Sequence, residues 1–244
     1  MKPWIAVWNI LKKDMKTYYL KPPNISWGII FPFAWTLMTL LRSQGQLDVY
    51  QVLPGVMAMS ILFGTTSMLA VTITFERRSR CFERLLLAPI NLNLLILAKI
   101  SGAIIFGVCN AFVPVVIALF VVDLAGVNWG LVCLSVLLMA IASTLLGLFV
   151  AVSVREVFEA QTFSNFFRFP MLFLCGLFIP ISQLPALIRP LSYLLPLTYG
   201  VNLLQIAVVR TGTIDPWFSV LALGGFIAVL FTWSMARVKR RWIV

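Results

Sequence analysis

WGLVCLSVLLMAIASTLLGLFVAVSV, residues 129–154, is a run of the chain without a single charged residue. About 20 residues of helix cross the roughly 30 Å hydrocarbon core of a membrane, and this run exceeds that length. Working outward from it, we find further apolar runs near residues 25–41, 51–75, 97–122, 158–180 and 216–236. The sequence therefore predicts an all-α polytopic membrane protein with six transmembrane helices, in a single domain that covers residues 1–244.

The composition agrees with this fold class and excludes others. Hydrophobic residues make up 61% of the chain and charged residues 11%, whereas about a quarter of a soluble domain is charged. The sequence contains no histidine, which excludes His-based acid–base catalysis, His-containing triads and His metal sites. The four cysteines lie apart from one another, at Cys81, Cys109, Cys133 and Cys175. They predict neither a disulfide framework nor a metal site.

The net charge of +11, from 19 basic and 8 acidic residues, is explained by membrane topology. Lys and Arg in short loops mark the cytoplasmic side. Sixteen basic residues fall on one predicted side: Lys2, Lys12, Lys13, Lys16, Lys21, Arg77, Arg78, Arg80, Arg84, Lys99, Arg155, Arg168, Arg237, Lys239, Arg240 and Arg241. Only Arg42, Arg189 and Arg210 fall on the other side. Both termini are therefore predicted to be cytoplasmic, and nucleic acid is not expected as a partner.

Residues 1–24 precede the first span and have an amphipathic pattern. Trp4, Trp8, Leu11 and Met15 recur at helical spacing, and most of the lysines lie elsewhere around the helix. This pattern predicts a helix in the cytoplasmic interface, with tryptophans at headgroup depth and lysines toward anionic lipid. Such a helix serves either as an anchor for the first span or as a moving gate, and its apolar face fits both.

Segment 75–90, FERRSRCFERLLLAPI, is the most informative stretch for function. In a helix, Phe82, Leu85 and Leu86 share one side, and Arg77, Arg80 and Arg84 share another. A basic loop without any partner would satisfy the topology. The two-sided arrangement favours a short helix that is offered to a partner protein.

Segment 179–200 follows the fifth span and is apolar, yet Pro180, Pro185, Pro190 and Pro196 interrupt it. Proline breaks helices into short pieces. Two interpretations remain open: an outer re-entrant segment that dips into the membrane before the sixth span, or a cap on the outer ends of the spans.

Two further groups of residues have more than one interpretation. The phenylalanines of the fifth span form either a wall for an apolar substrate or a face toward lipid and other helices; the substrate candidates are Phe163, Phe166, Phe167 and Phe173. At the cytoplasmic mouth of this span, Arg155, Glu156 and Glu159 suggest a salt bridge or a partner contact more than an ion relay.

The sequence lacks the motifs by which a single chain hydrolyses ATP, conducts ions or couples transport to an ion gradient. It contains no G-x-x-x-x-G-K-[ST] phosphate-binding loop, no TVGYG-like filter, and no charge that we place at the middle of a span. Any energy source is therefore expected on another subunit, and no bound cofactor or metal is expected on this chain.

Three features resemble the permease subunits of ABC type-2 exporters, such as drug and antibiotic-resistance permeases. They are the basic amphipathic N-terminus before a proline-containing span, the E-x-x-x-x-x-x-E-x-L-L-x-x-P-I pattern of residues 76–90, and the stretch 178–200 with its Leu-Pro pairs. The resemblance implies a cytoplasmic coupling helix at 76–90, a second permease protomer, and a separate cytoplasmic ATPase subunit that carries ATP and Mg.

By this resemblance, the coupling residues toward the ATPase are Glu76, Arg77, Arg80, Phe82, Glu83, Arg84, Leu85 and Leu86. Reversing the charges of Glu83 and Arg84 together is expected to abolish stimulation of the ATPase while membrane insertion continues. The implied location is the plasma (inner) membrane of a prokaryote.

The expected function is export of an apolar or amphipathic compound, drug-like or lipid, by an ATP-driven transporter of which this chain is the non-enzymatic permease. The alternative within the family is export of a lipid-linked polysaccharide; here the abundance of Phe, which cannot hydrogen-bond to sugar hydroxyls, favours the first. An intramembrane enzyme and a structural anchor for an ATPase are further alternatives.

Overall fold

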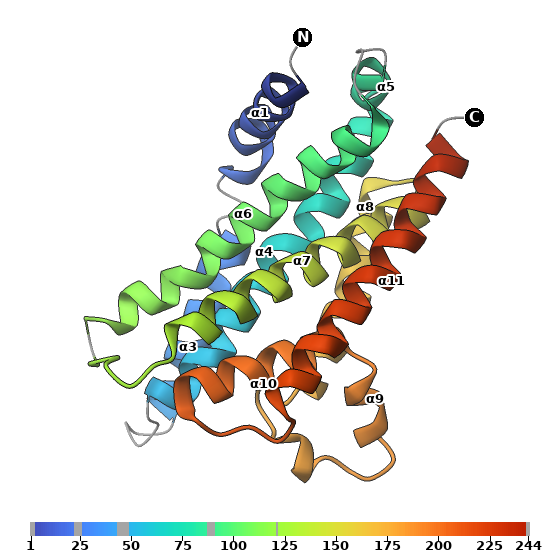
Figure 1. Cartoon of the computed structure of the whole chain (residues 1–244). Helices are drawn as coiled ribbons and strands as arrows, with labels where there is room; N and C mark the ends of the chain where they lie inside the picture. Colours follow the sequence, from blue (N-terminus) through green and yellow to red (C-terminus); the bar gives the residue numbers. More distant parts are fainter. Residues whose placement is uncertain (1–2, 22–25, 43–48, 87–90, 121, 243–244) are drawn as a thin grey trace.

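In the computed structural model, which describes residues 3–21, 26–42, 49–86, 91–120 and 122–242, the chain is a bundle of helices (Figure 1). The described segments contain helices, turns and irregular loops, without a strand. In chain order the helices are α1 (Pro3–Asp14), η1 (Met15–Tyr19), η2 (Ser26–Ile30), α3 (Phe31–Arg42), α4 (Val49–Arg78), α5 (Cys81–Leu86), α6 (Leu92–Ala118), α7 (Trp129–Ser153), α8 (Val157–Leu174), η3 (Ile181–Gln183), α9 (Arg189–Tyr193), α10 (Pro196–Val209) and α11 (Pro216–Trp242). The η1 and η2 segments are π-helical and η3 is a 3₁₀ turn.

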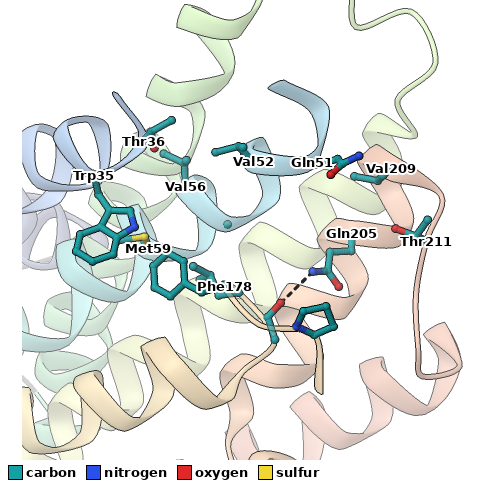
Figure 2. Close-up of a pocket in the computed structure, with 14 residues that line it drawn as sticks. Trp35, Thr36, Gln51, Val52, Val56, Met59, Phe178, Gln205, Val209 and Thr211 are labelled. Carbon is teal, nitrogen blue, oxygen red and sulfur yellow. Dashed lines mark hydrogen bonds between the residues drawn. The ribbon is translucent and has the colours of Figure 1, made fainter. Parts of the chain in front are cut away.

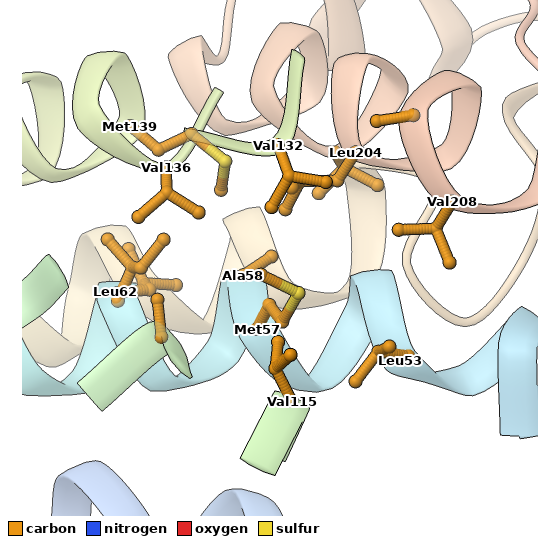
Figure 3. Close-up of a cluster of buried hydrophobic side chains, with 14 of the residues drawn as sticks. Leu53, Met57, Ala58, Leu62, Val115, Val132, Val136, Met139, Leu204 and Val208 are labelled. Atoms are coloured by element: carbon orange, nitrogen blue, oxygen red, sulfur yellow. The ribbon is translucent and has the colours of Figure 1, made fainter. Parts of the chain in front are cut away.

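Helix α4 is the central element of the bundle. Its residues from Leu53 to Ala70 are buried except Gly55, which is half-buried, because α6, α7, α8 and α10 all pack against it. Figure 3 shows Leu53, Met57 and Leu62 of α4 facing Val132 and Val136 of α7, with Leu204 and Val208 of α10 beside them. A helix that is apolar on every side suits this position, since no face of it meets solvent.

Close approach of α4 and α7 depends on a small residue. Gly147 of α7 lies so near α4 that a Cβ atom there would stand 2.4 Å from the backbone oxygen of Thr66. Small residues at helix crossings are a common device in membrane bundles, where backbones must come close for dispersion contacts. The pairing of these two helices is thus fixed by backbone contact.

The two ends of the bundle differ. The beginning of α1, the short helix α5 and the end of α11 lie together at one end, which we call the α5 end (Figure 1). Helices α9 and α10 lie at the opposite end, which we call the α10 end (Figure 1). The basic residues before α5 and in the last turns of α11 therefore share one end of the molecule.

Four of the six predicted spans are helices long and apolar enough to cross a membrane: Val49–Arg78, Leu92–Ala118, Trp129–Ser153 and Pro216–Arg240. The other two runs form shorter helical pieces. The run predicted at 25–41 is η2 followed by α3, and the run predicted at 158–180 is helical only to Leu174 in α8. Beyond Leu174 the chain turns at Gly176, which has a positive φ of 77°, a conformation that glycine adopts without steric cost.

The predicted boundaries of the proline-rich segment were wrong. The segment expected at 179–200 contains η3 and α9, and its last five residues begin α10, which continues to Val209. Pro196 is at the first turn of α10, where proline is tolerated because its missing N–H has no helical partner. It therefore starts a buried helix, whereas the sequence pattern predicts that it interrupts an outer re-entrant segment or cap.

Candidate functional site

The expected coupling helix is shorter than the sequence pattern indicated. Residues 76–78 continue α4, a turn at Ser79 and Arg80 follows, and α5 begins at Cys81. Arg80 has a φ of 56°, a left-handed conformation that non-glycine residues seldom adopt. The prediction of a single helix over 76–90 was therefore wrong for its first residues. Residues 87–90 lie outside the described segments.

The side chains around α5 separate into an exposed and a buried group. Arg80 and Arg84 are exposed, whereas Phe82 is 2% exposed. Phe82 packs into an apolar cluster with Ile10 and Leu95, and Leu85 lies at the edge of that cluster. The two-sided helix is thus present, but its buried side faces its own chain. Arg77 is half-buried, and the side chains of Glu83 and Leu86 are outside what the structure describes.

Glu76 departs from its expected position on the docking surface. Its side chain is fully buried, and its carboxylate lies 2.6 Å from Nζ of Lys13 and 2.5 Å from Nζ of Lys99. A carboxylate that two ammonium groups enclose in this way does not face a partner protein. Its role lies within the chain.

Glu76 belongs to a network of four charges from three helices. Lys99 Nζ is 3.0 Å from Asp14 Oδ2, and Lys13 Nζ is 3.1 Å from Asp14 Oδ1. Asp14, Glu76 and Lys99 are each at most 1% exposed, while Lys13 remains half-exposed. Burial opposes the charge on Lys13, but the hydrogen bond to Glu76 and the charges of Asp14 and Glu76 outweigh it and raise its pKa.

Sequence reasoning missed this network because it placed these residues in separate cytoplasmic segments: Lys13 in an interfacial helix, Glu76 on a docking helix and Lys99 in a basic connection. Lys99 is the only charge within the apolar run LLILAKI of residues 94–100, and Asp14 is the only acid among the N-terminal lysines. An isolated charge in an apolar helix needs a partner. The need of Lys99 and Asp14 for an oppositely charged partner was therefore the signal in the sequence that could have indicated their pairing.

The carboxylates of the predicted cytoplasmic mouth cap a helix. Glu156 and Glu159 form a reciprocal capping box at the start of α8, with Glu159 Oε2 accepting the backbone N–H of Arg155 at 3.0 Å. Glu156 also pairs with Arg78 at the end of α4. The three predicted residues do come together, and the partner of Glu156 is an arginine that the sequence analysis did not select.

Arg168 was wrongly placed at a cytoplasmic flank. It lies within α8, is 2% exposed, and its guanidinium stacks 4.8 Å from the ring centroid of Phe63 in α4. One of its N–H groups donates to the backbone oxygen of Phe63 at 3.2 Å. The positive charge therefore joins α8 to the middle of α4.

The four selected phenylalanines divide between the surface and contacts among neighbouring helices. Phe166 and Phe173 are 66% and 49% exposed, whereas Phe163 and Phe167 are half-buried. Rings of Phe163, Phe166 and Phe167 lie within 6.2 Å of one another, centroid to centroid. The ring of Phe167 also meets Phe149 of α7 at 5.8 Å. They form an aromatic face on α8.

A cavity of about 580 Å³ lies toward the α10 end, between α3, α4, the chain after α8, and α10. Figure 2 shows Trp35, Val56, Met59 and Phe178 around it, with the amide of Gln205 at one side. The rings of Trp35 and Phe178 are 5.2 Å apart, and Gln205 donates a hydrogen bond to the backbone oxygen of Gly176 at 3.2 Å. The lining is largely apolar with a few amide and hydroxyl groups, which is typical of small-molecule pockets.

Comparisons of the sequence with known proteins point to one family. The family model described as ABC-2 type transporter matches residues 5–209. The chain is 24% identical over 207 residues to the inner membrane transport permease YadH of Escherichia coli (strain K12), covering 82% of this chain and 81% of that protein. It is also 34% identical over 79 residues to nodulation protein J of Sinorhizobium fredii, covering 32% of this chain and 30% of that one.

The family model covers most of the chain, and the apolar helices fit an inner-membrane protein with several spans. A permease of this kind is a transporter's membrane subunit, distinct from a catalytic enzyme, and the family implies an ATPase as its partner. The chain belongs to the ABC-2 type transporter family, as a transmembrane subunit of an ABC transporter.

Proposed function

We propose that this chain is the permease of an ATP-driven exporter, which moves an apolar or amphipathic compound out of the cytoplasm or the inner leaflet. A separate cytoplasmic ATPase, carrying ATP and Mg, would supply the energy. The observation that carries the proposal is the short helix α5, which lies at the same end as the start of α1 and the end of α11 (Figure 1), with Arg80 and Arg84 exposed.

The docking surface we propose is narrower than the whole segment 76–90. Glu76 and Phe82 contact other residues of this chain. We therefore assign the contacts with the ATPase to Arg80, Arg84 and the backbone of the turn between α4 and α5. Exposed arginines suit recognition of carboxylates on a partner, because the guanidinium binds them in a bidentate manner. Phe82 then serves to hold α5 against α4 and α6, so that a push on α5 reaches both helices.

A purification experiment tests the docking surface. The tagged chain is purified in mild detergent from its own organism, the accompanying ATPase is identified, and vanadate-sensitive ATP hydrolysis is measured. The double variant R80E/R84E is expected to insert normally but to lose the ATPase. The matched control K239E/R240E reverses two exposed charges of α11 at the same end. Equal loss in both variants would contradict a surface confined to α5.

The topology we propose has six spans with both termini in the cytoplasm. In this arrangement η2 with α3, and α8, are the two shorter spans, and the α5 end is cytoplasmic. One observation supports it: the basic residues before α5 and in the last turns of α11 lie at the same end (Figure 1). The positive-inside rule assigns such an end to the cytoplasm. Green fluorescent protein fused to the C-terminus should fluoresce, whereas an alkaline phosphatase fusion there should be inactive; the reverse pattern would refute this topology.

For the path of the substrate, we propose the aromatic face of α8 and the neighbouring cavity. The volume of about 580 Å³ falls within the range of pockets for drug-sized molecules, roughly 300–1,000 Å³. Trp35, Met59 and Phe178 supply apolar contacts there. A drug-like or lipid compound fits this lining better than a lipid-linked polysaccharide, whose hydroxyl groups need more hydrogen-bond partners. Loss of ATPase stimulation by apolar compounds in Met59→Asp, with the variant complex intact, would support this assignment.

We also propose that two permeases pair. Helices α3 and α8 each expose large apolar side chains, which are Phe33, Leu37 and Met38 on α3 and Phe166, Phe169 and Phe173 on α8. Contact with a second protomer across these faces would cover part of them and would place the substrate path between the two copies.

A further inference from the structure

Lys99 of α6 stands between two carboxylates from different helices. Its Nζ is 3.0 Å from Asp14 at the end of α1 and 2.5 Å from Glu76 near the end of α4. Lys13 completes the group by reaching Glu76 at 2.6 Å. Two positive and two negative charges therefore balance within one buried network that connects α1, α4 and α6.

The network lies at the base of the segment proposed to receive the ATPase. Glu76 lies three residues before Ser79, where the turn into α5 begins. Lys99 lies in the second turn of α6, the helix that follows α5. The Glu76–Lys99 pair consequently connects the end of α4 to the start of α6, on either side of α5 in the chain. Phe82 of α5 packs in the same apolar cluster as Ile10 of α1. Charge pairs thus hold α1 to α4 and α6, the two helices that flank α5, and α1 and α5 contribute side chains to one apolar cluster.

The other side of α1 faces away from the bundle. Trp4 is 78% exposed, Ile5 50% and Trp8 64%, a set of side chains suited to the lipid interface. Helix α1 is therefore held by its charged end to α4 and α6, while its apolar face remains available to lipid.

Buried ion pairs contribute little net stability compared with apolar packing, but removing one partner is strongly unfavourable. Such a network favours one relative position of its helices over all neighbouring positions. We infer that Lys13, Asp14, Glu76 and Lys99 are positioning residues that make α1 move together with α5, so that ATP-driven displacement of α5 also shifts α1 at the membrane surface. This inference rests on the proposed docking of the ATPase at α5.

The experiment follows α1 directly. In a variant with the four cysteines replaced by alanine, a bimane label is attached at Asn9→Cys, an exposed position on α1. A second sample keeps Cys81, which is exposed at the start of α5, as its labelled cysteine, and a third carries the label at Thr232→Cys, exposed on α11. Emission is recorded for the purified complex with its ATPase, before and after ATP with vanadate, together with the rate of ATP hydrolysis and the melting temperature.

Two charge-balanced variants are compared. K13M/D14N removes the link to α1 and leaves the Glu76–Lys99 pair, whereas E76Q/K99M removes that pair and leaves Lys13 beside Asp14. In K13M/D14N the ATP-dependent change at Asn9 should fall by at least about fivefold, the lower bound of typical coupling between linked sites, while the change at Cys81 persists. Conservative K13R should retain the response at Asn9. If K13M/D14N does not assemble, K13Q alone is used.

The outcomes separate the two proposals. An ATP-dependent change at Cys81 without any at Asn9 in the unmodified network would overturn the joint movement of α1 and leave the docking of the ATPase intact. No ATPase in the purified complex would instead overturn the proposed function. An undiminished response at Asn9 in K13M/D14N, with a lowered melting temperature, would show that the network is only structural.

Discussion

Replacing Gly147 by alanine should destabilise the bundle, although alanine is the better helix former. The new Cβ would lie 2.4 Å from the backbone oxygen of Thr66, 3.2 Å from its carbonyl carbon and 3.3 Å from its Cα. Carbon–oxygen contacts between packed helices settle near 3.3–3.6 Å, so α4 and α7 would have to separate by roughly 0.9 Å at this point. The obstructing atoms are backbone, and no side-chain rotation relieves the overlap.

The magnitude follows from two opposing effects. Overpacking costs about 1–3 kcal/mol, and the upper part of that range applies because α4 is held on its other sides by α6, α8 and α10. The gain in helix propensity from glycine to alanine offsets about 0.5–1 kcal/mol. We expect a net loss of about 1–2 kcal/mol, which corresponds to a fall of roughly 2–8 °C in melting temperature for a chain of this size.

Thermal unfolding in detergent, monitored by the fraction of chain that remains monodisperse after heating, measures this loss. Gly224→Ala in α11 is the matched control, because a Cβ there meets nothing within 4 Å. It changes the same residue type in another long helix and should leave the melting temperature unchanged or slightly raised. A Gly147→Ala chain as stable as Gly224→Ala would refute the backbone contact between α4 and α7.

Three other predictions concern polar groups. Lys99→Met leaves Lys13 as the remaining cation beside Asp14 and Glu76 in the network, and it should lower the free energy of unfolding by about 3–5 kcal/mol. The double variant K99M/E76Q should lose less stability in the same melting assay, and an equal loss would contradict the network. Asn202 accepts the N–H groups of Thr213 and Ile214 and donates to Ile214 and Ser219, so Asn202→Ala should cost about 1–3 kcal/mol and speed protease cleavage near 211–215; unchanged cleavage would argue against this role. The pKa of Lys13 is raised from 10.5, so its protonated form stabilises the fold at every pH below that value and this contribution is lost only as the pH rises past the folded pKa. The difference in melting temperature between the native chain and Lys13→Met should therefore be constant from about pH 7 to 9, and a decline within that range would contradict the assignment.

Length and hydropathy were sufficient to predict the long helices. The runs at 51–75 and 216–236 lie within α4 and α11, and those at 97–122 and 129–154 form most of α6 and α7, which end at Ala118 and Ser153. About 20 apolar residues in sequence have few other stable arrangements. Ends of helices were harder to predict. Proline marks a helix start as readily as a break, so the pattern assigns Pro196, the first residue of α10, to the interrupted outer segment.

Charge partners could not be predicted, because they come from distant parts of the chain. Lys13 reaches Glu76 across 63 positions and Lys99 reaches Asp14 across 85, distances over which no local pattern operates. The sequence therefore predicted the amphipathic character of α5 but assigned Glu76 and Phe82 to its outer surface. Packing against α1 and α6 decides that both are internal.

The exposed arginines near α5 and the enclosed charges beneath it should respond oppositely to ionic strength. Arg80 and Arg84 face water, where salt screens charges over about 8 Å at 0.15 M. Asp14, Glu76 and Lys99 are shielded from water by the chain, so added salt reaches them poorly. High-salt washing should therefore strip a partner from α5 while α1 stays fixed to the permease, and isolation at low ionic strength is the condition that keeps the transporter whole.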